Sequence, residues 1–379
     1  MKKQIYIALF FLFSGWALPS QDIFFSSPQN LGIWLNPART GALPGKAKKD
    51  GSNSFSSPGG DFQDRFNLAY RSQWAHLEDG PAFQTALAAY DHRFCFGADQ
   101  FGLGMQLWSD WAGSPSIRMS EVKLSAAYLR MMGTGRKRDW SLNIGAGFEA
   151  GFLQTQFNAG KLTFDRQFDG LDFNPGLPSG EAFIESMRNQ LDLGAGLFFQ
   201  WVKNKTQYTG SLRDIKPFME LGLSLRHFNL PVQRFKTDEV FLLRDFGVNN
   251  RVTWGLHGAG RGNIPGLKLF YRLEAAAWKQ DRLWMGQFIV EPGLAVGDSG
   301  LLTTIGAGLR ITRNDAGDLP LSDAILLKAG LQNGPYFVTV SYDYALNPMR
   351  LLPGWMGTFE AAVTYLMGSA KKECVRCPR

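Results

Sequence analysis

The stretch GTFEAAVTYLM, residues 357–367, decides the fold class because its apolar and polar side chains alternate with period two. Phe359 and Val363 fall on one face of an extended chain, and Thr358 and Glu360 fall on the other. This periodicity is typical of a β-strand whose two faces lie in different environments.

The same alternation recurs along the chain. It is seen in FGLGMQL (101–107), LDLGAGLF (191–198), MELGLSLR (219–226) and YFVTVSYDY (336–344). We count about fourteen such segments of roughly ten residues each, the length that a tilted strand needs to cross a bilayer. The sequence therefore predicts an all-β fold: a single-chain transmembrane outer-membrane β-barrel of about 14 antiparallel strands.

The predicted strands also set the topology. They begin near Asp64, Phe83, Gln100, Met119, Asp139, Gln190, Lys216, Asn250, Gly266, Met285, Leu301, Asp323, Tyr336 and Trp355. Connections after even strands are mostly short (297–300, 333–335), whereas two long ones (152–189, 228–249) follow odd strands. Short periplasmic turns and long extracellular loops are usual in such barrels, so we expect both termini in the periplasm.

Composition agrees with a membrane barrel. The 379 residues include 43 Gly, 30 Phe and 11 Trp, and only 19% are charged, which is unusual for a soluble cytosolic enzyme. The formal net charge is +7, but Lys and Arg are scattered, which gives nucleic-acid binding little support. Scattered basic residues suit anionic lipid headgroups or an acidic partner equally well.

The N-terminus resembles a secretory signal. Residues 1–20 join a basic start at Lys2 and Lys3 to a short apolar run, so cleavage before Gln21 is expected. We then expect an N-terminal segment and linker (21–62), a transmembrane β-barrel (63–367) and a periplasmic C-terminal tail (368–379). The protein should be multi-pass in the outer membrane and in contact with its lipid.

Three cysteines occur: Cys95, Cys374 and Cys377. The CxxC spacing of the last two lies at the chain end, without further ligands for zinc and without the strand-helix context of a redox motif. A local disulfide or free thiols in the tail is the favoured interpretation, and we expect no metal site and no cofactor.

Charged residues on the polar strand faces should point into the lumen. They are Lys123, Asp192, Arg226, Arg272, Glu274, Arg310, Asp343 and Glu360. Such a lumen would suit a water-filled channel, a plugged pore, a binding cavity, or charges that neutralise one another. Tryptophans near strand ends suggest interfacial girdles or core aromatics. These are Trp140, Trp201, Trp254, Trp278, Trp284 and Trp355.

Catalysis has weak support. Asp91 and His92 would need a nearby serine to form a lipid-active hydrolase, and no serine can be assigned to them from spacing. We therefore expect a protein without enzymatic activity.

Several motifs in order resemble the PorP/SprF family of outer-membrane proteins of the type IX secretion system. They include LNPARTG (35–41), YRSQW (70–74), AAYDHRF (88–94), FGLGMQLWSDWAG (101–113), AGKLTFDRQFDG (159–170), FNPGLPSGE (173–181) and LRHFNLPVQRF (225–235). The resemblance covers nearly the whole chain after the signal. It departs in a long GKAKKDGSNSFSSPGGDF stretch (45–62) and in the absence of a C-terminal aromatic residue.

This resemblance implies a role in protein export. Family members receive or tether surface proteins that carry a type B C-terminal sorting domain, notably gliding adhesins, and some associate with the periplasmic ring of the machine. The expected partners are therefore such a secreted protein and other secretion components. A general porin or solute channel is the alternative, and a barrel hydrolase is a weaker one.

LNPARTG is rich in turn chemistry, from Asn36-Pro37 to Thr40-Gly41. We expect residues 21–44 to fold against the periplasmic mouth or into the lumen, with Arg71 and Gln73 as partners; a merely tethered arm is the alternative. Tyr70 and Trp74 of YRSQW are further structural or interfacial candidates.

The long loop 152–189 mixes aromatic and acidic residues, a composition that suits protein binding or a self-contained cap. Its candidate contact residues are Phe164, Asp165, Phe168, Asp169 and Phe173.

Overall fold

The computed structural model describes most of the barrel and the segment that precedes it. The described residues are 23–43, 62–73, 83–96, 99–112, 117–132, 140–156, 165–170, 172–174, 176–178, 188–203, 217–234, 247–249, 251–264, 267, 269–296, 301–314, 321–346 and 357–368. The expected signal peptide, most of the linker and nearly all of the C-terminal tail lie outside them.

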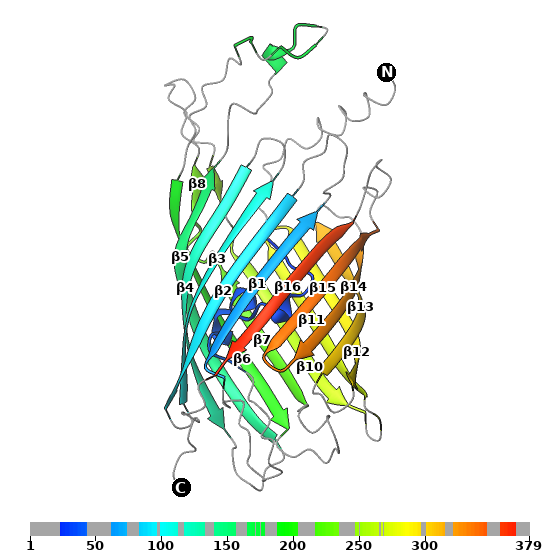
Figure 1. The fold of residues 1–379 in the computed structure, drawn as a ribbon. Coiled ribbons are helices and arrows are strands. Elements are labelled where there is room, and N and C mark those ends of the chain that lie inside the picture. The colour runs from blue at the N-terminus through cyan, green and yellow to red at the C-terminus, as the bar shows by residue number, and fades with distance from the viewer. Residues whose placement is uncertain are drawn as a thin grey trace.

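Fourteen strands close into one antiparallel barrel (Figure 1). They are β1 (Asp64–Gln73), β2 (Phe83–Phe96), β3 (Asp99–Ala112), β4 (Ile117–Met132), β5 (Trp140–Gln156), β6 (Arg188–Lys203), β7 (Phe218–Arg226), β10 (Thr253–Asn263), β11 (Leu269–Gln280), β12 (Leu283–Val296), β13 (Leu301–Asn314), β14 (Leu321–Asn333), β15 (Tyr336–Ala345) and β16 (Thr358–Met367). Each pairs with its sequence neighbour, β7 pairs with β10, and β1 pairs with β16 to close the wall. A separate ribbon joins β8 (Val232–Arg234) to β9 (Gly247–Asn249).

The two ends of the barrel differ. We call the end at which β1 begins and β16 ends the lower end, and the opposite one the upper end, as in Figure 1. The connections 97–98, 264–268, 297–300 and 334–335 lie at the lower end, and the much longer ones 157–187 and 227–252 lie at the upper end. The predicted alternation holds for most of the barrel, with two clear exceptions: a fourteen-residue connection, 204–217, joins β6 to β7 at the lower end, and a two-residue turn, 281–282, joins β11 to β12 at the upper end.

Strand length is the feature that the sequence described least well. Against the expected ten or so residues, β5 has 17 and β7 has 9. The wall is therefore taller on the β3–β6 side, as Figure 1 shows. Alternation continues beyond the length needed to cross a bilayer, so periodicity alone does not show where a strand should stop.

Side chains sort between the two faces as predicted. In β16, Phe359 is 47% exposed on the outside, whereas Glu360 is 1% exposed in the lumen. Along the described strands, large apolar residues face outward and most polar ones face inward. Of the two alternatives for the tryptophans near strand ends, Trp278 is a core aromatic: it is buried in the lumen, where it packs against Phe24.

Residues 23–43, which we call the lumenal segment, lie inside the barrel as the blue chain of Figure 1. They form three short helices: η1 (Pro28–Asn30), α2 (Gly32–Leu35) and η2 (Pro37–Arg39). Their apolar side chains pack against both β1–β5 and β11, β12 and β16, so the segment bridges opposite walls. The sequence left three placements open for this segment: against the periplasmic mouth, inside the lumen, or as a tethered arm. In the structure it lies inside the lumen.

The direction of the lumenal segment follows from its contacts. Leu43 packs against Phe62 and Leu366 at the lower end, whereas Ser26 contacts Glu360 near the upper end of β16. From residue 23 to residue 43 the segment therefore runs from the upper part of the lumen down to the lower end.

Two further observations complete the fold. No helix within the described residues is long and apolar enough to cross a membrane. Cys95 of β2 takes part in a disulfide bond, which the expectation of a disulfide within the C-terminal tail does not explain. Cys374 and Cys377 lie outside the described residues.

Candidate functional site

The local shape of the lumenal segment comes from LNPARTG itself. The Asn36 side chain caps η2 by accepting a hydrogen bond from Ala38 N at 2.8 Å, and Pro37 occupies the first helical position. Thr40 Oγ1 donates to Pro37 O at 2.8 Å and so closes the turn. Gly41 then takes a φ of 73°, which glycine adopts without strain.

Asn36 also fixes the segment to the barrel wall. Its Nδ2 donates to Leu197 O at 2.9 Å and to Leu223 O at 3.0 Å, on neighbouring strands β6 and β7. The same atom lies 3.1 Å from His257 Nε2 on β10. One fully buried amide therefore contacts three strands, and it gives buried backbone carbonyl groups of the wall a hydrogen-bond partner.

A second anchor lies near the lower end. Gly41 N donates to Asp91 Oδ2 at 2.7 Å, and Arg65 holds both oxygens of Asp91 at 2.9 Å. Arg65 also donates to Arg39 O at 3.1 Å. This bidentate, charge-assisted pair fixes the C-terminal end of the lumenal segment at the lower end of the barrel.

A third anchor lies near the upper end. The backbone N–H groups of Ser26 and Ser27 donate to the two carboxylate oxygens of Glu360 at 2.7 and 2.9 Å. Arg71 donates to Ser26 Oγ at 2.7 Å and forms ion pairs with Glu360 and Asp343 at 3.2 and 3.1 Å. Arg71 is therefore a partner of the segment.

Arg39 is the charged side chain that the segment brings into the lumen. Its guanidinium pairs with Glu220 of β7 at 3.3 Å and stacks over the Phe198 ring at 5.9 Å. Burial lowers the pKa of Arg39 from its ordinary value, and the Glu220 carboxylate opposes this shift. Arg226 of β7 likewise donates to Trp34 O and stacks over the Trp34 ring.

Two glycines of the wall let the segment approach closely. A Cβ built on Gly147 of β5 would lie about 2.5 Å from backbone atoms of Pro37 and Ala38. A Cβ on Gly102 of β3 would clash with the backbone of Thr40. Backbone cannot rotate away as a side chain can, so a residue with a side chain at either position would force the segment to move.

The remaining lumen charges are paired with one another. Lys123 contacts Glu121, Glu149 and Asp192 at 3.2, 3.1 and 2.7 Å. Lys328 joins Glu274 and Glu291 at 2.8 and 2.6 Å, and Arg310 joins Asp323 and Asp343, both at 2.8 Å. These groups are mostly buried, which is how a membrane barrel accommodates charge.

The other residues of YRSQW are placed differently. Tyr70 points outward and is 42% exposed. Gln73, at the upper end of β1, pairs with Arg71 once its amide is turned so that the oxygen faces the guanidinium. Trp74 lies outside the described residues.

Part of the long loop above β5 and β6 is well defined. Phe168 and Phe173 form an isolated β-bridge, and Asp169 accepts a hydrogen bond from Asp172 N at 2.9 Å. Both phenylalanines are exposed, at 56% and 42%, as are Asp165 and Asp169. This green segment projects from the upper end in Figure 1. Phe164 lies outside the described residues.

Asp91 and His92 do not form a catalytic dyad. They are neighbours on one strand and so face opposite sides: Asp91 binds Arg65 in the lumen, whereas His92 Nδ1 lies 2.6 Å from Asp64 Oδ1. Among the described residues, no group of three or more His, Cys, Asp or Glu side chains could hold a metal ion.

Sequence reasoning missed several partners of the lumenal segment. Asn67 donates to Asn30 O at 2.8 Å, and Gln287 donates to Phe25 O and Ser26 O, both at 3.4 Å. Their inward positions could be read from alternation. Which of them meets the segment depends on contacts across 37 residues of sequence for Asn67 and more than 260 for Gln287, and local spacing does not contain that information.

Comparison with known proteins adds the decisive observation, since residues 59–365 match the family described as "Type IX secretion system membrane protein PorP/SprF". The chain belongs to the PorP/SprF family. It is thus a membrane protein of the type IX secretion system with an outer-membrane type of barrel. No curated protein matches the chain.

Solved barrels resemble this PorP/SprF protein only distantly. The TodX monoaromatic hydrocarbon channel deltaS2 mutant has a TM-score of 0.48 at 10% identity, with 90% of this chain and 94% of that chain covered. CdiB from Acinetobacter baumannii has a TM-score of 0.42 at 9% identity, over 80% and 60% of the two chains. A Pseudomonas aeruginosa FadL homologue has a TM-score of 0.40 at 13% identity, over 88% and 97%.

Proposed function

We propose that this protein receives, helps to export or anchors surface proteins that carry a type B C-terminal sorting domain, such as gliding adhesins. Membership of the PorP/SprF family is the single observation that carries this proposal. The protein acts as a binding and docking component without chemistry of its own, and its partners are the secreted protein and other components of the secretion machine.

The filled lumen supports this proposal over a general porin. A porin needs a water-filled path, whereas the lumenal segment here bridges opposite walls and is held by buried anchors at both ends. These contacts are specific and numerous, so they favour a barrel built to remain closed while it binds a partner at its surface.

The orientation belongs to the same proposal. Most short turns lie at the lower end and the longest connections at the upper end, which supports a periplasmic position for the lower end by analogy with other outer-membrane barrels. The upper-end loops would then face the cell exterior, and the lower end would face the periplasmic ring of the machine.

The exposed bridge of Phe168 and Phe173 is our candidate contact for the exported protein. Two aromatic rings that lie largely in solvent on a defined turn are suited to a protein interface, because burying them on binding contributes strongly to affinity. Asp165, Asp169 and the sequence neighbour Phe164 belong to the same candidate surface.

The test is affinity purification of the tagged, full-length protein from outer membranes in a mild detergent, followed by mass spectrometry. A stoichiometric surface protein that ends in a sorting domain is the expected result. Recovery with periplasmic ring components alone would restrict the role to the core machine. A solitary barrel with ion conductance in planar bilayers would overturn the proposal in favour of a porin.

A further inference from the structure

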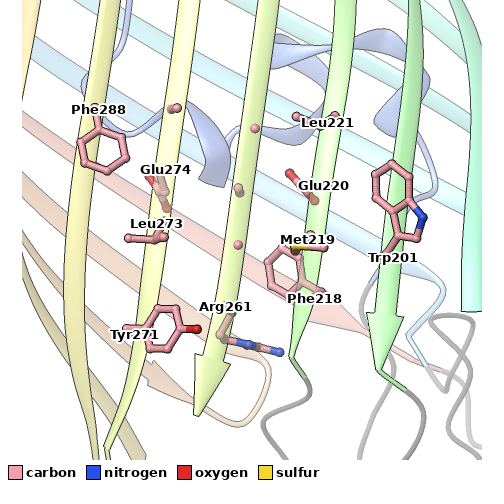
Figure 2. A pocket seen from close by; sticks show the side chains of 14 residues that line it. Trp201, Phe218, Met219, Glu220, Leu221, Arg261, Tyr271, Leu273, Glu274 and Phe288 are labelled. Atoms are coloured by element: carbon pink, nitrogen blue, oxygen red, sulfur yellow. The ribbon is translucent and has the colours of Figure 1, made fainter. Parts of the chain in front are cut away.

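A groove on the outer wall over β10 is mainly apolar (Figure 2). Met219, Leu221 and Phe288 are exposed along it, and Glu220, which borders it, is already paired with Arg39 in the lumen. This surface therefore suits contact with lipid rather than covalent chemistry. A side chain that has already formed a covalent bond lies at the lower end of β2.

That side chain is Cys95, which takes part in a disulfide bond. It is half-buried, and it lies on the same face of β2 as the lumenal residues Asp91 and Arg93. The 379 residues contain only two other cysteines, Cys374 and Cys377. A partner within this chain can therefore only be one member of the CxxC pair, and the other member is then left over.

The strand registers bring the start of the C-terminal tail close to Cys95. Met367, the last residue of β16, lies two strands away from His92 of β2, with β1 between them. Cys95 follows His92 by three residues, so the Cα atoms of Met367 and Cys95 lie about 14 Å apart, given strands about 4.8 Å apart and a rise of about 3.4 Å per residue. Seven residues lead from Met367 to Cys374, which span about 23 Å when extended, and ten lead to Cys377. Both cysteines of the pair are therefore within reach.

Side-chain contacts at the lower end converge on the same place. Leu366, directly before the end of β16, packs against Leu43 and Phe62. Arg93, two residues from Cys95 on the same face of β2, donates to the carbonyl oxygens of Leu43 and Phe62. The end of β16 and the end of β2 are therefore joined through the same two residues, where the lumenal segment ends and β1 is about to begin.

We propose that Cys95, Cys374 and Cys377 form one thiol–disulfide exchange site, which ties the C-terminal tail to β2 in one state and releases it in the other. In the tied state, one cysteine of the CxxC pair is bonded to Cys95 and the other is a thiol. The bond passes across β1, so the strands that close the barrel are also joined covalently. The site does not depend on how the exported protein binds, so this proposal and the proposed function can fail separately.

The exchange needs no oxidant or reductant. The thiolate of the left-over cysteine attacks the sulfur of its CxxC neighbour, an S–S bond forms within the pair, and the S–S bond to Cys95 breaks. Cys95 leaves as a thiolate and takes up a proton in place of the one that the attacking thiol lost. One disulfide and one thiol are present before and after the step. Residues 372–379 hold three basic side chains against one acidic side chain, and net positive charge favours the attacking thiolate.

Peptide mapping tests the connectivity, because trypsin places the three cysteines in three different peptides: 94–118, 373–376 and 377–379. Free thiols of the full-length protein in outer membranes are first blocked with N-ethylmaleimide, and the digest is then analysed by mass spectrometry without reduction. We expect 94–118 to be joined to a tail peptide in most chains, with one label on the other tail cysteine. In the remaining chains, the two tail peptides should be joined to each other, with the label on Cys95.

The concentration of the reagent distinguishes exchange from two fixed populations. If the two states interconvert, dilute N-ethylmaleimide traps the thiol that reacts faster, whereas concentrated reagent records the populations as they stand. The fraction of label on Cys95 should therefore change by about twofold or more when the reagent is diluted about a hundredfold. An equal fraction at both concentrations would overturn the exchange. A peptide 94–118 that is never joined to a tail peptide would overturn the whole proposal.

Three variants serve as controls, and heat-modifiable mobility on gels confirms that each is folded. Cys374→Ser and Cys377→Ser should each keep 94–118 joined to the tail and should lose the label, because no third thiol remains. Cys95→Ser should join the two tail peptides to each other, again without a label. Two labels per chain in both tail variants would show that neither tail cysteine bonds to Cys95, which would also overturn the proposal.

Discussion

The Nδ2 atom of Asn36 lies 3.1 Å from Nε2 of His257, and it also donates to two main-chain carbonyl oxygens of the wall. A side-chain amide donates two hydrogen atoms and carries no charge, so it can satisfy the two carbonyl oxygens without leaving a buried ion. Asparagine is therefore required here for two reasons: its oxygen caps η2, and its nitrogen fixes the segment to the barrel.

Asn36→Ala is expected to lower the free energy of unfolding by about 1–3 kcal/mol, because two buried carbonyl groups and a helix cap lose their partner. Asn36→Asp should cost more, since its carboxylate would face the same carbonyl oxygens. Denaturant unfolding followed by tryptophan fluorescence measures both, with Trp34 and Trp278 as reporters in the lumen. An aspartate variant as stable as wild type would refute this account.

Gly147→Ala is expected to displace the lumenal segment, because the new Cβ would lie about 2.5 Å from its backbone. Limited trypsin digestion in detergent should then cut after Arg39 much faster than in the wild type. Gly260→Ala is the control, since its Cβ would meet only Phe218 O, at 3.7 Å, which is an ordinary van der Waals contact. Equal digestion of the two variants would show that the wall tolerates a methyl group at Gly147.

Deletion of residues 23–43 should open the lumen to ions. Asp91 keeps Arg65 and Asp343 keeps Arg310, while Glu220 loses Arg39 but still accepts a hydrogen bond from Gln200, so the barrel itself should still close. Stepwise conductance in planar bilayers is expected for the deletion variant and not for the wild type. A folded deletion variant without conductance would show that other parts of the chain block the path.

Lys123→Met should destabilise the barrel by about 3–5 kcal/mol, because it leaves Glu121, Glu149 and Asp192 buried without their shared cation. Denaturant unfolding of the variant and the wild type measures the difference. Lys279→Met, on the exposed face of β11, should change stability by no more than about 0.5 kcal/mol.

Replacing both Phe168 and Phe173 with serine should abolish capture of the exported protein and leave the barrel unchanged, because both rings are exposed above the wall. Co-purification measures capture, and denaturant unfolding measures stability. A matched variant, Phe66→Ser, removes an exposed aromatic residue from the lipid-facing wall and should not affect capture. Undiminished capture by the double variant would move the contact surface elsewhere on the protein.

The barrel could be predicted from sequence because its signal is local. Alternation around Glu360 and Phe359 already shows which residues share the polar face of the strand and which share the apolar face. The predicted start of every strand lies within three residues of the observed one. Trp278 shows the limit of this reasoning: a tryptophan near a strand end suggests a lipid interface, yet its parity on β11 turns it inward onto Phe24.

The anchors of the lumenal segment could be predicted only in part. The turn residues Asn36 and Thr40 and the partner Arg71 were evident from their chemistry. The pairing of Gly41 with Asp91 was not, because it depends on which wall the segment approaches once fourteen strands have closed. Residue type identifies a group that needs a partner, but only the three-dimensional fold identifies the partner.

The direction of the lumenal segment constrains the order of assembly. Ser26 precedes all fourteen barrel strands in the sequence, and its partner Glu360 lies 334 residues later on β16, the strand that pairs with β1 to close the barrel. Contacts so distant in sequence form late, because the long intervening loop must close first. The lumenal segment can therefore take its final position only when β16 pairs with β1, so the barrel closes around a part of its own chain that precedes every strand.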